Sequence, residues 1–299
     1  MSGRHPLLPF LSVALGIATF SMMDAAMKSA SIQAGVYSAL LLRNVFGSAL
    51  MLPVWLLTGG RWPQAPALKV HVLRSAVVSV MAVLFFWGLV RTPMAEAIAL
   101  AFIAPLIALY FAAVLLGETI RPSAIAASLL GIVGVLVIGA ARFGHGEFDS
   151  GSALGIAAIL ISAVFYALNL VLQRHQAQLA SPAEIALFQN LCVGLFLLPA
   201  AAWFFIWPES TALRDIATSA VLAVLALIFL AWGYARAETQ ALVPIEYTGF
   251  LWAALAGWFW FGESVSSGTV AGAVLIVAAC WIAARKPTKL TAPQPVLPP

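Results

Sequence analysis

Charged residues are scarce in this sequence of 299 residues. Asp, Glu, Lys and Arg make up 9% of it, whereas 63% of the residues are hydrophobic and the mean hydropathy is +1.02. Soluble domains carry roughly one quarter charged residues, because a chain of this size needs a far more polar surface in water. The composition therefore excludes a soluble globular protein and indicates a lipid bilayer as the surrounding solvent.

Other absences exclude classes of chemistry. Cys192 and Cys280 are the only cysteines and lie in apolar stretches, so no disulfide or thiol chemistry is expected. The four histidines fall in predicted termini or loops, at His5, His71, His145 and His175. No H-E-x-x-H metal pair, G-x-S-x-G serine elbow or G-x-x-x-x-G-K phosphate loop occurs. We therefore expect no metal, no cofactor and no enzyme activity.

Apolar stretches dominate the chain instead. The net charge is +4, but no basic stretch is interleaved with exposed polar surface, so nucleic acid is not an expected partner. Ten stretches of roughly 20 residues can each cross a hydrocarbon core of about 30 Å. They lie near 7–27, 35–57, 72–92, 95–116, 121–141, 152–173, 182–206, 213–233, 238–261 and 266–284. The sequence thus predicts an all-α polytopic membrane protein with ten transmembrane helices.

Basic residues are distributed unevenly between the two sides that these helices define. With the N-terminus inside, ten lie on the inner side, four on the outer side, and Arg43 lies within a helix. The inner ones are Arg4, Arg61, Lys69, Arg74, Arg121, Arg174, Arg236, Arg285, Lys286 and Lys289, and the outer ones are Lys28, Arg91, Arg142 and Arg214. The positive-inside rule therefore places both termini in the cytoplasm.

The chain also repeats itself. WGLVR at 87–91 recurs as WGYAR at 232–236, an offset of 145 residues. The same offset places Gly117-Glu118 on Gly262-Glu263. Each half holds five predicted helices, and because five is odd the halves must be inverted relative to each other. We therefore predict two inverted five-helix repeats, 1–144 and 145–286, with a disordered tail at 287–299. Such repeats are typical of secondary transporters, with the substrate site between the halves.

These features resemble the EamA-type members of the drug/metabolite transporter superfamily. The resemblance covers about residues 7–284 and is densest in PIEYTGFLWAALAGWFWFGE (244–263). It implies an inner-membrane carrier, a monomer or weak homodimer, whose third, fourth, eighth and ninth helices line a cavity. A weaker similarity points to the YddG-like aromatic amino-acid exporters. Pro105 departs from strict symmetry, because Phe250 matches it in the other half.

Few polar residues are predicted at membrane depth, where charges are costly and usually functional. Asp24 and Arg43 lie on consecutive helices, and their repeat counterparts Asn169 and Gln189 are neutral amides. They predict a structural ion pair or a gate. Glu246 has no acidic counterpart, and it is either a site for a substrate ammonium or proton, or a structural hydrogen-bonding group. The candidate amides for a substrate anion are Asn44, Asn169 and Asn190.

Aromatic residues form two predicted groups. One lies near helix ends, where an interfacial belt is expected: Trp55, Trp62, Trp203, Trp207 and Trp281. The other lies deeper and can stack on an aromatic or cationic substrate: Trp87, Tyr110, Tyr166, Trp232, Tyr234, Tyr247 and Trp252. Packing or lipid contact is the alternative for each ring.

The predicted function is export of small amphipathic metabolites, foremost aromatic or hydrophobic amino acids, by alternating access. Export of cationic drugs is the alternative, as is a passive channel, although no continuous polar stripe is evident along one helix. The run GTVAG (268–272) indicates close helix packing or a dimer seam. The expected partners are a small-molecule substrate and the lipid bilayer.

Overall fold

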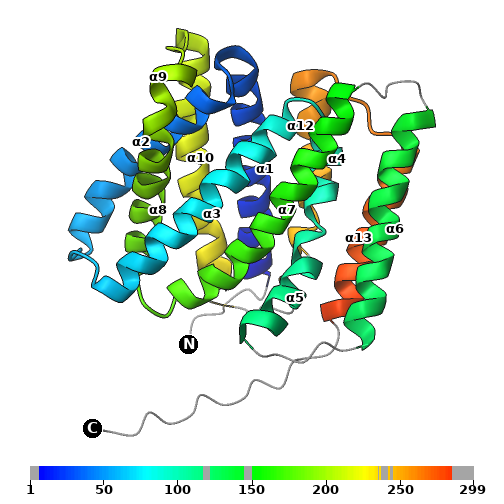
Figure 1. Ribbon diagram of the computed structural model, residues 1–299, viewed down its shortest axis with the longest axis horizontal. Coiled ribbons are helices and arrows are strands. Elements are labelled where there is room, and N and C mark those ends of the chain that lie inside the picture. Colours follow the sequence, from blue (N-terminus) through cyan, green and yellow to red (C-terminus); the bar gives the residue numbers. More distant parts are fainter. Residues whose placement is uncertain are drawn as a thin grey trace, which may run out of the picture.

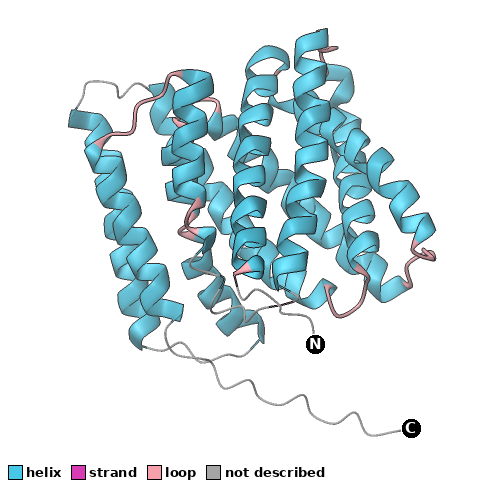
Figure 2. Ribbon diagram, turned by 180° about the vertical axis from the view of Figure 1, so that it is seen from behind, coloured by secondary structure: helices cyan, strands magenta, loops and turns pink. Residues whose placement is uncertain are grey.

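The protein is a bundle of helices in the computed structural model (Figures 1 and 2). The structure describes residues 7–116, 122–144, 150–234, 236, 242 and 245–284, and none of these lies in a strand. The helices of the first half are α1 (Leu8–Ala34), α2 (Val36–Leu57), α3 (Ala65–Leu89), α4 (Met94–Ala101), α5 (Ala104–Leu116) and α6 (Pro122–Gly144). Those of the second half are α7 (Ser150–Gln176), α8 (Pro182–Leu197), the short η1 (Leu198–Ala200) and α9 (Ala201–Phe204), then α10 (Ser210–Tyr234), α12 (Gly249–Phe261) and α13 (Ser267–Ala284).

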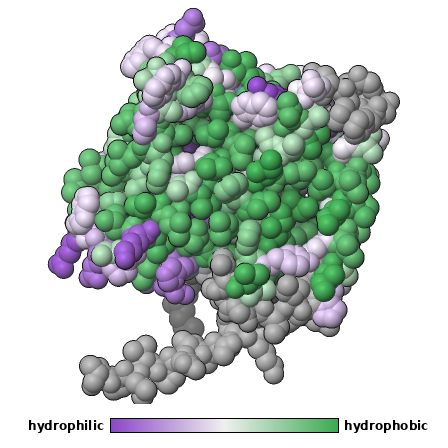
Figure 3. Space-filling model, viewed as in Figure 1, coloured by the Kyte–Doolittle hydropathy of each residue, from purple (hydrophilic) through white to green (hydrophobic). Residues whose placement is uncertain are grey.

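Many of these helices can cross a membrane. Seven described helical segments are long and apolar enough to do so, and three shorter apolar helices lie at 125–141, 249–261 and 267–282. Apolar residues cover the middle of the molecule and polar residues gather at its two ends (Figure 3). The chain is therefore an all-helical, multi-pass membrane protein.

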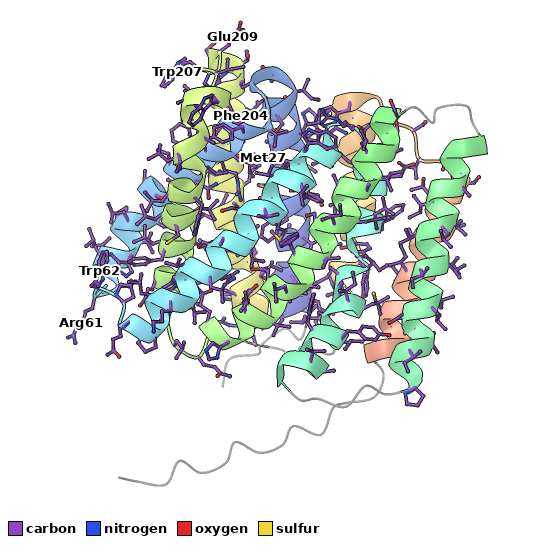
Figure 4. All side chains as sticks on the ribbon, in the orientation of Figure 1. Met27, Arg61, Trp62, Phe204, Trp207 and Glu209 are labelled. Atoms are coloured by element: carbon purple, nitrogen blue, oxygen red, sulfur yellow. The ribbon has the colours of Figure 1, made fainter. Side chains whose placement is uncertain are left out.

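Two faces of the bundle can be distinguished. α1 begins and α13 ends on one of them, here called the terminal face, and α1 ends on the other, the opposite face (Figure 1). Arg61 and Trp62 lie toward the terminal face, and Trp207 and Glu209 toward the opposite face (Figure 4). Trp62 and Trp207 are both more than 70% exposed. Exposed indoles at both ends of an apolar belt agree with the predicted interfacial positions.

Prolines interrupt two of the predicted spans. The stretch predicted at 95–116 is divided at residues 102–103 into α4 and α5. Pro105 explains the break, because it has no N–H to donate and its ring clashes with the carbonyl of Ala101. The stretch predicted at 182–206 is likewise divided into α8, η1 and α9 around Pro199. Gly117-Glu118, Pro244 and the tail lie outside the described residues.

Helix packing follows the sequence repeat. α1 packs on α10, and α3 packs on α7. The repeat makes α7 the counterpart of α1 and α10 the counterpart of α3. The α1–α10 contact of one half with the other is therefore equivalent to the α3–α7 contact. The remaining large contacts join counterparts to each other, α2 to α8 and α6 to α13.

The glycine of each repeated pentapeptide sits at such a contact. A Cβ at Gly88 on α3 would lie 2.6 Å from Ile159 and 2.7 Å from the carbonyl oxygen of Gly155, both on α7. A Cβ at Gly233 on α10 would lie 2.6 Å from Val13 of α1. Only glycine therefore permits these close helix crossings.

The arginine of each pentapeptide caps its own helix end. Arg91 donates to the Trp87 carbonyl at 2.8 Å, and its guanidinium lies 3.6 Å from the Trp87 ring centre. Arg236 repeats this on Trp232, at 3.0 and 4.2 Å. α3 and α10 end on different faces of the bundle (Figure 1). The repeated sequence thus builds the same helix terminus once on each face.

Glycines also bring α6 and α13 together. A Cβ at Gly134 would lie 2.6 Å from Ile276 and 2.8 Å from the carbonyl oxygen of Gly272. A Cβ at Gly272 would meet Ile138 and Gly134 in turn, and one at Gly268 would meet α6 as well. The GTVAG run therefore packs against α6 of the same chain.

Candidate functional site

A largely buried ion pair lies toward the opposite face. Lys28 at the end of α1 pairs with Glu263, which follows α12, and donates to the Thr92 carbonyl at 2.8 Å. The other carboxylate oxygen of Glu263 accepts from the backbone N–H of Met94 at 2.7 Å. Gly262, with φ +64°, makes the turn that presents this carboxylate. Glu263 thus binds the start of α4, which lies in the other half of the chain.

Further polar contacts join helix ends on this face. Ser29 donates to Asp215 at 2.6 Å, and Gln33 donates to the same carboxylate at 3.1 Å. Glu96, buried in the first turn of α4, accepts from Thr269 of α13 at 3.2 Å. Several polar contacts between the two halves of the chain therefore lie on the opposite face.

Toward the terminal face, Arg74 forms a buried polar cluster between α3 and α7. Its Nε donates to Asn169 at 2.8 Å, and its two terminal nitrogens donate to Gln176 and, at 3.3 Å, to Gln173. Only 5% of Arg74 is exposed. Arg74, predicted among the basic residues of the inner side, is instead buried within α3.

His71 extends this cluster to α8. Its Nδ1 lies 2.6 Å from Nε2 of Gln176, its Nε2 lies 3.0 Å from the Glu184 carboxylate, and its ring stacks on Phe188. The amide donor of Gln176 fixes the tautomer that carries its proton on Nε2 and donates it to Glu184. The prediction that all histidines lie in termini or loops was wrong for His71, which is fully buried in α3.

These partners belong to a polar stripe on α7. Its members recur every three or four residues and so share one face of the helix: Ser162, Tyr166, Asn169, Gln173 and Gln176. The expectation that no helix carries a continuous polar stripe was therefore wrong for α7. Ser162 donates to a carbonyl of α3 at 2.8 Å, which shows that this face points into the bundle.

Tyr166 is a partly exposed member of the polar stripe of α7 that interacts with charged groups. It lies on the inward face of α7, yet 39% of it is exposed. Glu246, Asp24 and Arg74 all act electrostatically on its phenol. Glu246 is itself exposed. Tyr166 therefore sits where acidic groups and a buried cation from different helices converge.

The direct ion pair predicted for Asp24 and Arg43 is absent. The two charges interact electrostatically, but no nitrogen–oxygen pair between them lies within 4.0 Å. The direct ion pair on this part of α1 forms one turn later, at Lys28, with a partner from the other half of the chain. The Nε of Arg43 is buried without a hydrogen-bond acceptor.

The predicted aromatic residues differ in how they are used. Arg91 and Arg236 cover Trp87 and Trp232. Three others have no such cover: Tyr247 packs edge-on against Phe102, Trp252 has a buried indole N–H without an acceptor, and Tyr110 is half-buried on α5. The side chain of Tyr234 lies outside the described ones.

Asn44 on α2 and Asn190 on α8, the amides predicted to bind an anion, lie where these two helices cross. Asn44 donates to the Leu40 carbonyl at 2.7 Å, and Asn190 donates to that of Ala186 at 2.8 Å. A Cβ at Gly47 would collide with the Asn190 side chain. Asn169 alone among the predicted asparagines reaches a charged group.

Two grooves are lined mainly by apolar side chains. One, of about 540 Å³, runs between α12 and α13 and includes Tyr247 and Trp281. The other, of about 460 Å³, lies between α3 and α8. Within the described part of the chain, no group of three His, Cys, Asp or Glu side chains is arranged to hold a metal ion.

An apolar helical bundle with charges converging inside it is typical of membrane transporters. The profile of the EamA-like transporter family matches residues 7–140 and again residues 153–285. The chain therefore belongs to the EamA-like transporter family of the drug/metabolite transporter superfamily, and it is a transporter rather than an enzyme.

Several characterised proteins are similar along most of their length. The pseudopaline exporter of Pseudomonas aeruginosa is 26% identical over 88% of this chain and 90% of its own. The S-adenosylmethionine uptake transporter of Rickettsia prowazekii is 23% identical over 89% and 88%. A probable terminal-alkyne amino-acid exporter of Streptantibioticus cattleyicolor is 29% identical over 76% and 77%. A solved crystal structure shares the fold, with a TM-score of 0.63 and 22% identity over 92% of this chain and 96% of its own.

Proposed function

We propose that this protein exports amino acids, preferably aromatic or hydrophobic ones, across the bacterial inner membrane by alternating access. The supporting observation is the surrounding of Tyr166, where the acids Glu246 and Asp24 and the cation Arg74 act on one accessible ring. A zwitterion needs both signs of charge at its site. Two similar proteins are named as exporters, one of them a probable exporter of a terminal-alkyne amino acid.

The proposed architecture is ten transmembrane helices in two inverted halves, 1–144 and 145–286. Two separate matches to one family profile support the halves. Their inversion is supported by the α1–α10 and α3–α7 contacts, which repeat one another. In this arrangement both termini are cytoplasmic, and the terminal face is the inner one. The carrier acts as a monomer or weak homodimer.

Closure of the opposite face fits one state of an alternating cycle. Lys28, Glu263 and Met94 join three segments there. Opening requires these bonds to break, while contacts on the terminal face tighten. We propose Glu246 as the site for the substrate ammonium or a coupled proton, with Tyr166, Tyr247 and Trp252 as its aromatic surroundings. The unpaired N–H groups of Arg43 and Trp252 offer donors to a bound substrate.

Two alternatives make different demands on the site. An exporter of cationic drugs needs Glu246 and the rings but no cation, so the buried Arg74 disfavours it. A passive channel needs a continuous wet path, and the polar stripe of α7 favours it. Three of its five members, however, are occupied by hydrogen bonds to Arg74 and His71.

The test is efflux from proteoliposomes loaded with a mixed pool of amino acids and cationic dyes, followed by mass spectrometry. Protein and a Glu246→Gln variant are compared with and without an imposed pH gradient. We expect selective, saturable loss of aromatic and branched amino acids, with the pH response absent in the variant. Efflux of dyes alone refutes the amino-acid proposal, and non-saturable efflux of all solutes identifies a channel.

A further inference from the structure

We propose that Arg74 is the binding group for the carboxylate of the substrate. This inference rests on the proposed transport of amino acids and identifies the anion end of the site. Asn44 and Asn190 are less suited to this role, because each already donates one amide N–H to a carbonyl of its own helix and neither carries a positive charge.

Arg74 carries a charge that its neighbours solvate but do not neutralise. All of its hydrogen-bond acceptors are neutral side-chain amides of α7. No carboxylate lies within 4.0 Å of it among the described residues. Arginine remains charged in proteins, and charged side chains at membrane depth normally pair with an opposite charge. A substrate anion would provide the missing counter-charge.

The guanidinium also retains hydrogen-bonding capacity. Arginine has five N–H donors in a planar fork, and three of those of Arg74 are used by Asn169, Gln173 and Gln176. The remaining two, one on each terminal nitrogen, can donate to a further anionic acceptor such as a carboxylate. The same three amides fix the conformation of the Arg74 side chain. Binding of a substrate therefore does not have to restrict the motion of this side chain.

One of the three partners of the guanidinium is exposed. Asn169 and Gln176 are buried, whereas Gln173, which accepts from a terminal nitrogen at 3.3 Å, is exposed. The accessible Tyr166 lies one turn along the same face of α7 from Asn169 and interacts electrostatically with Arg74. The acids Asp24 and Glu246 act on Tyr166 as well. A cation that lacks a carboxylate partner and two acids thus interact with the same ring, a combination that suits an α-amino acid.

The test compares equilibrium binding of matched ligands to purified protein. Each amino acid of the transported pool is paired with its decarboxylated amine and its deaminated acid, such as phenylalanine with phenethylamine and 3-phenylpropionate. In Arg74→Gln we expect affinity for the two carboxylate-bearing ligands to fall about 10- to 100-fold, the loss of charge-assisted hydrogen bonds. Affinity for the amine stays within about twofold, because the amine does not use this site.

Control variants separate this role from a structural one. Arg61→Gln removes an exposed arginine and should leave all three affinities unchanged. Arg74→Lys keeps the charge but loses the fork, so it should lower only the carboxylate affinities, by a few fold. This variant also provides the answer if Arg74→Gln does not fold. Equal losses for amine and acid would assign Arg74 to structure and overturn the proposal.

The outcomes distinguish this inference from the proposed function. Binding of 3-phenylpropionate that depends on Arg74, without binding of phenylalanine, would support the anion site and refute amino-acid transport. Amino-acid binding that is unchanged in Arg74→Gln and Arg74→Lys would support amino-acid transport and refute the anion site at Arg74. A protein that binds no carboxylate-bearing member of any pair refutes the anion site directly.

Discussion

Lys28 and Glu263 form an ion pair that joins the end of α1 to the loop after α12, although 235 residues separate them in the sequence. Both side chains are largely shielded from solvent, and each has a second polar partner, the Thr92 carbonyl for Lys28 and the Met94 N–H for Glu263. The pair thus joins both halves of the chain on one face.

Breaking this pair on one side is expected to be costly. Lys28→Met leaves the Glu263 carboxylate shielded and without its cation, which should lower the free energy of unfolding by about 3 kcal/mol. Adding Glu263→Gln removes the stranded charge and should restore at least half of that loss. Unfolding in detergent, followed for both single variants and the double variant, measures the coupling. Strictly additive losses would show that the pair contributes nothing.

Asp24 and Arg43 should be more weakly coupled, because they interact without direct contact. We expect a coupling energy of about 1 kcal/mol from Asp24→Asn and Arg43→Gln, smaller than that of Lys28 and Glu263. The same double-mutant cycle measures it. A larger coupling than at Lys28 would indicate that a direct pair forms in another state. Normal transport by the double variant would exclude a gating role.

Two glycines of α6 provide a matched test of helix packing. A Cβ at Gly134 would overlap α13, whereas one at Gly139 would meet nothing within 4 Å. Gly134→Ala should therefore lower the unfolding free energy by about 1–3 kcal/mol. Gly139→Ala should leave it unchanged or raise it by up to about 1 kcal/mol, because alanine favours the helix. Thermal unfolding of both variants measures these changes in unfolding free energy. Equal changes for Gly134→Ala and Gly139→Ala would contradict the α6–α13 packing.

Trp87 and Trp232 should not bind substrate, because Arg91 and Arg236 cover them. Trp87→Leu and Trp232→Leu should reduce the unfolding free energy by at most about 1 kcal/mol through loss of the cation–π contact. The KM for transport should change less than twofold. A tenfold rise in the KM for transport, in a variant that still folds, would show that these tryptophan rings do bind substrate.

The helical architecture was predictable because apolar runs and prolines act locally. The ten predicted stretches overlap described helices, and the break near residue 102 follows from Pro105. Arg74 and His71 were misjudged because burial depends on which helix packs beside them. Their partners recur at helical spacing on α7, a signal present in the sequence, but only the α3–α7 contact reveals what it satisfies. Glu263 shows the same limit, since its partners come from the other half.

The C-terminal ends of α3 and α10, where each arginine binds groups of its own helix, affect how the chain is inserted into the membrane. Arg91 and Arg236 each find an acceptor and an aromatic face within one turn of their own helix. Neither needs a lipid phosphate or a cytoplasmic partner. In the proposed orientation Arg91 has to be translocated against the usual preference for arginine to remain inside. The indole of Trp87 already partly covers this charge. The same helix-end sequence can therefore be used in either leaflet, at the end of α3 and at the end of α10.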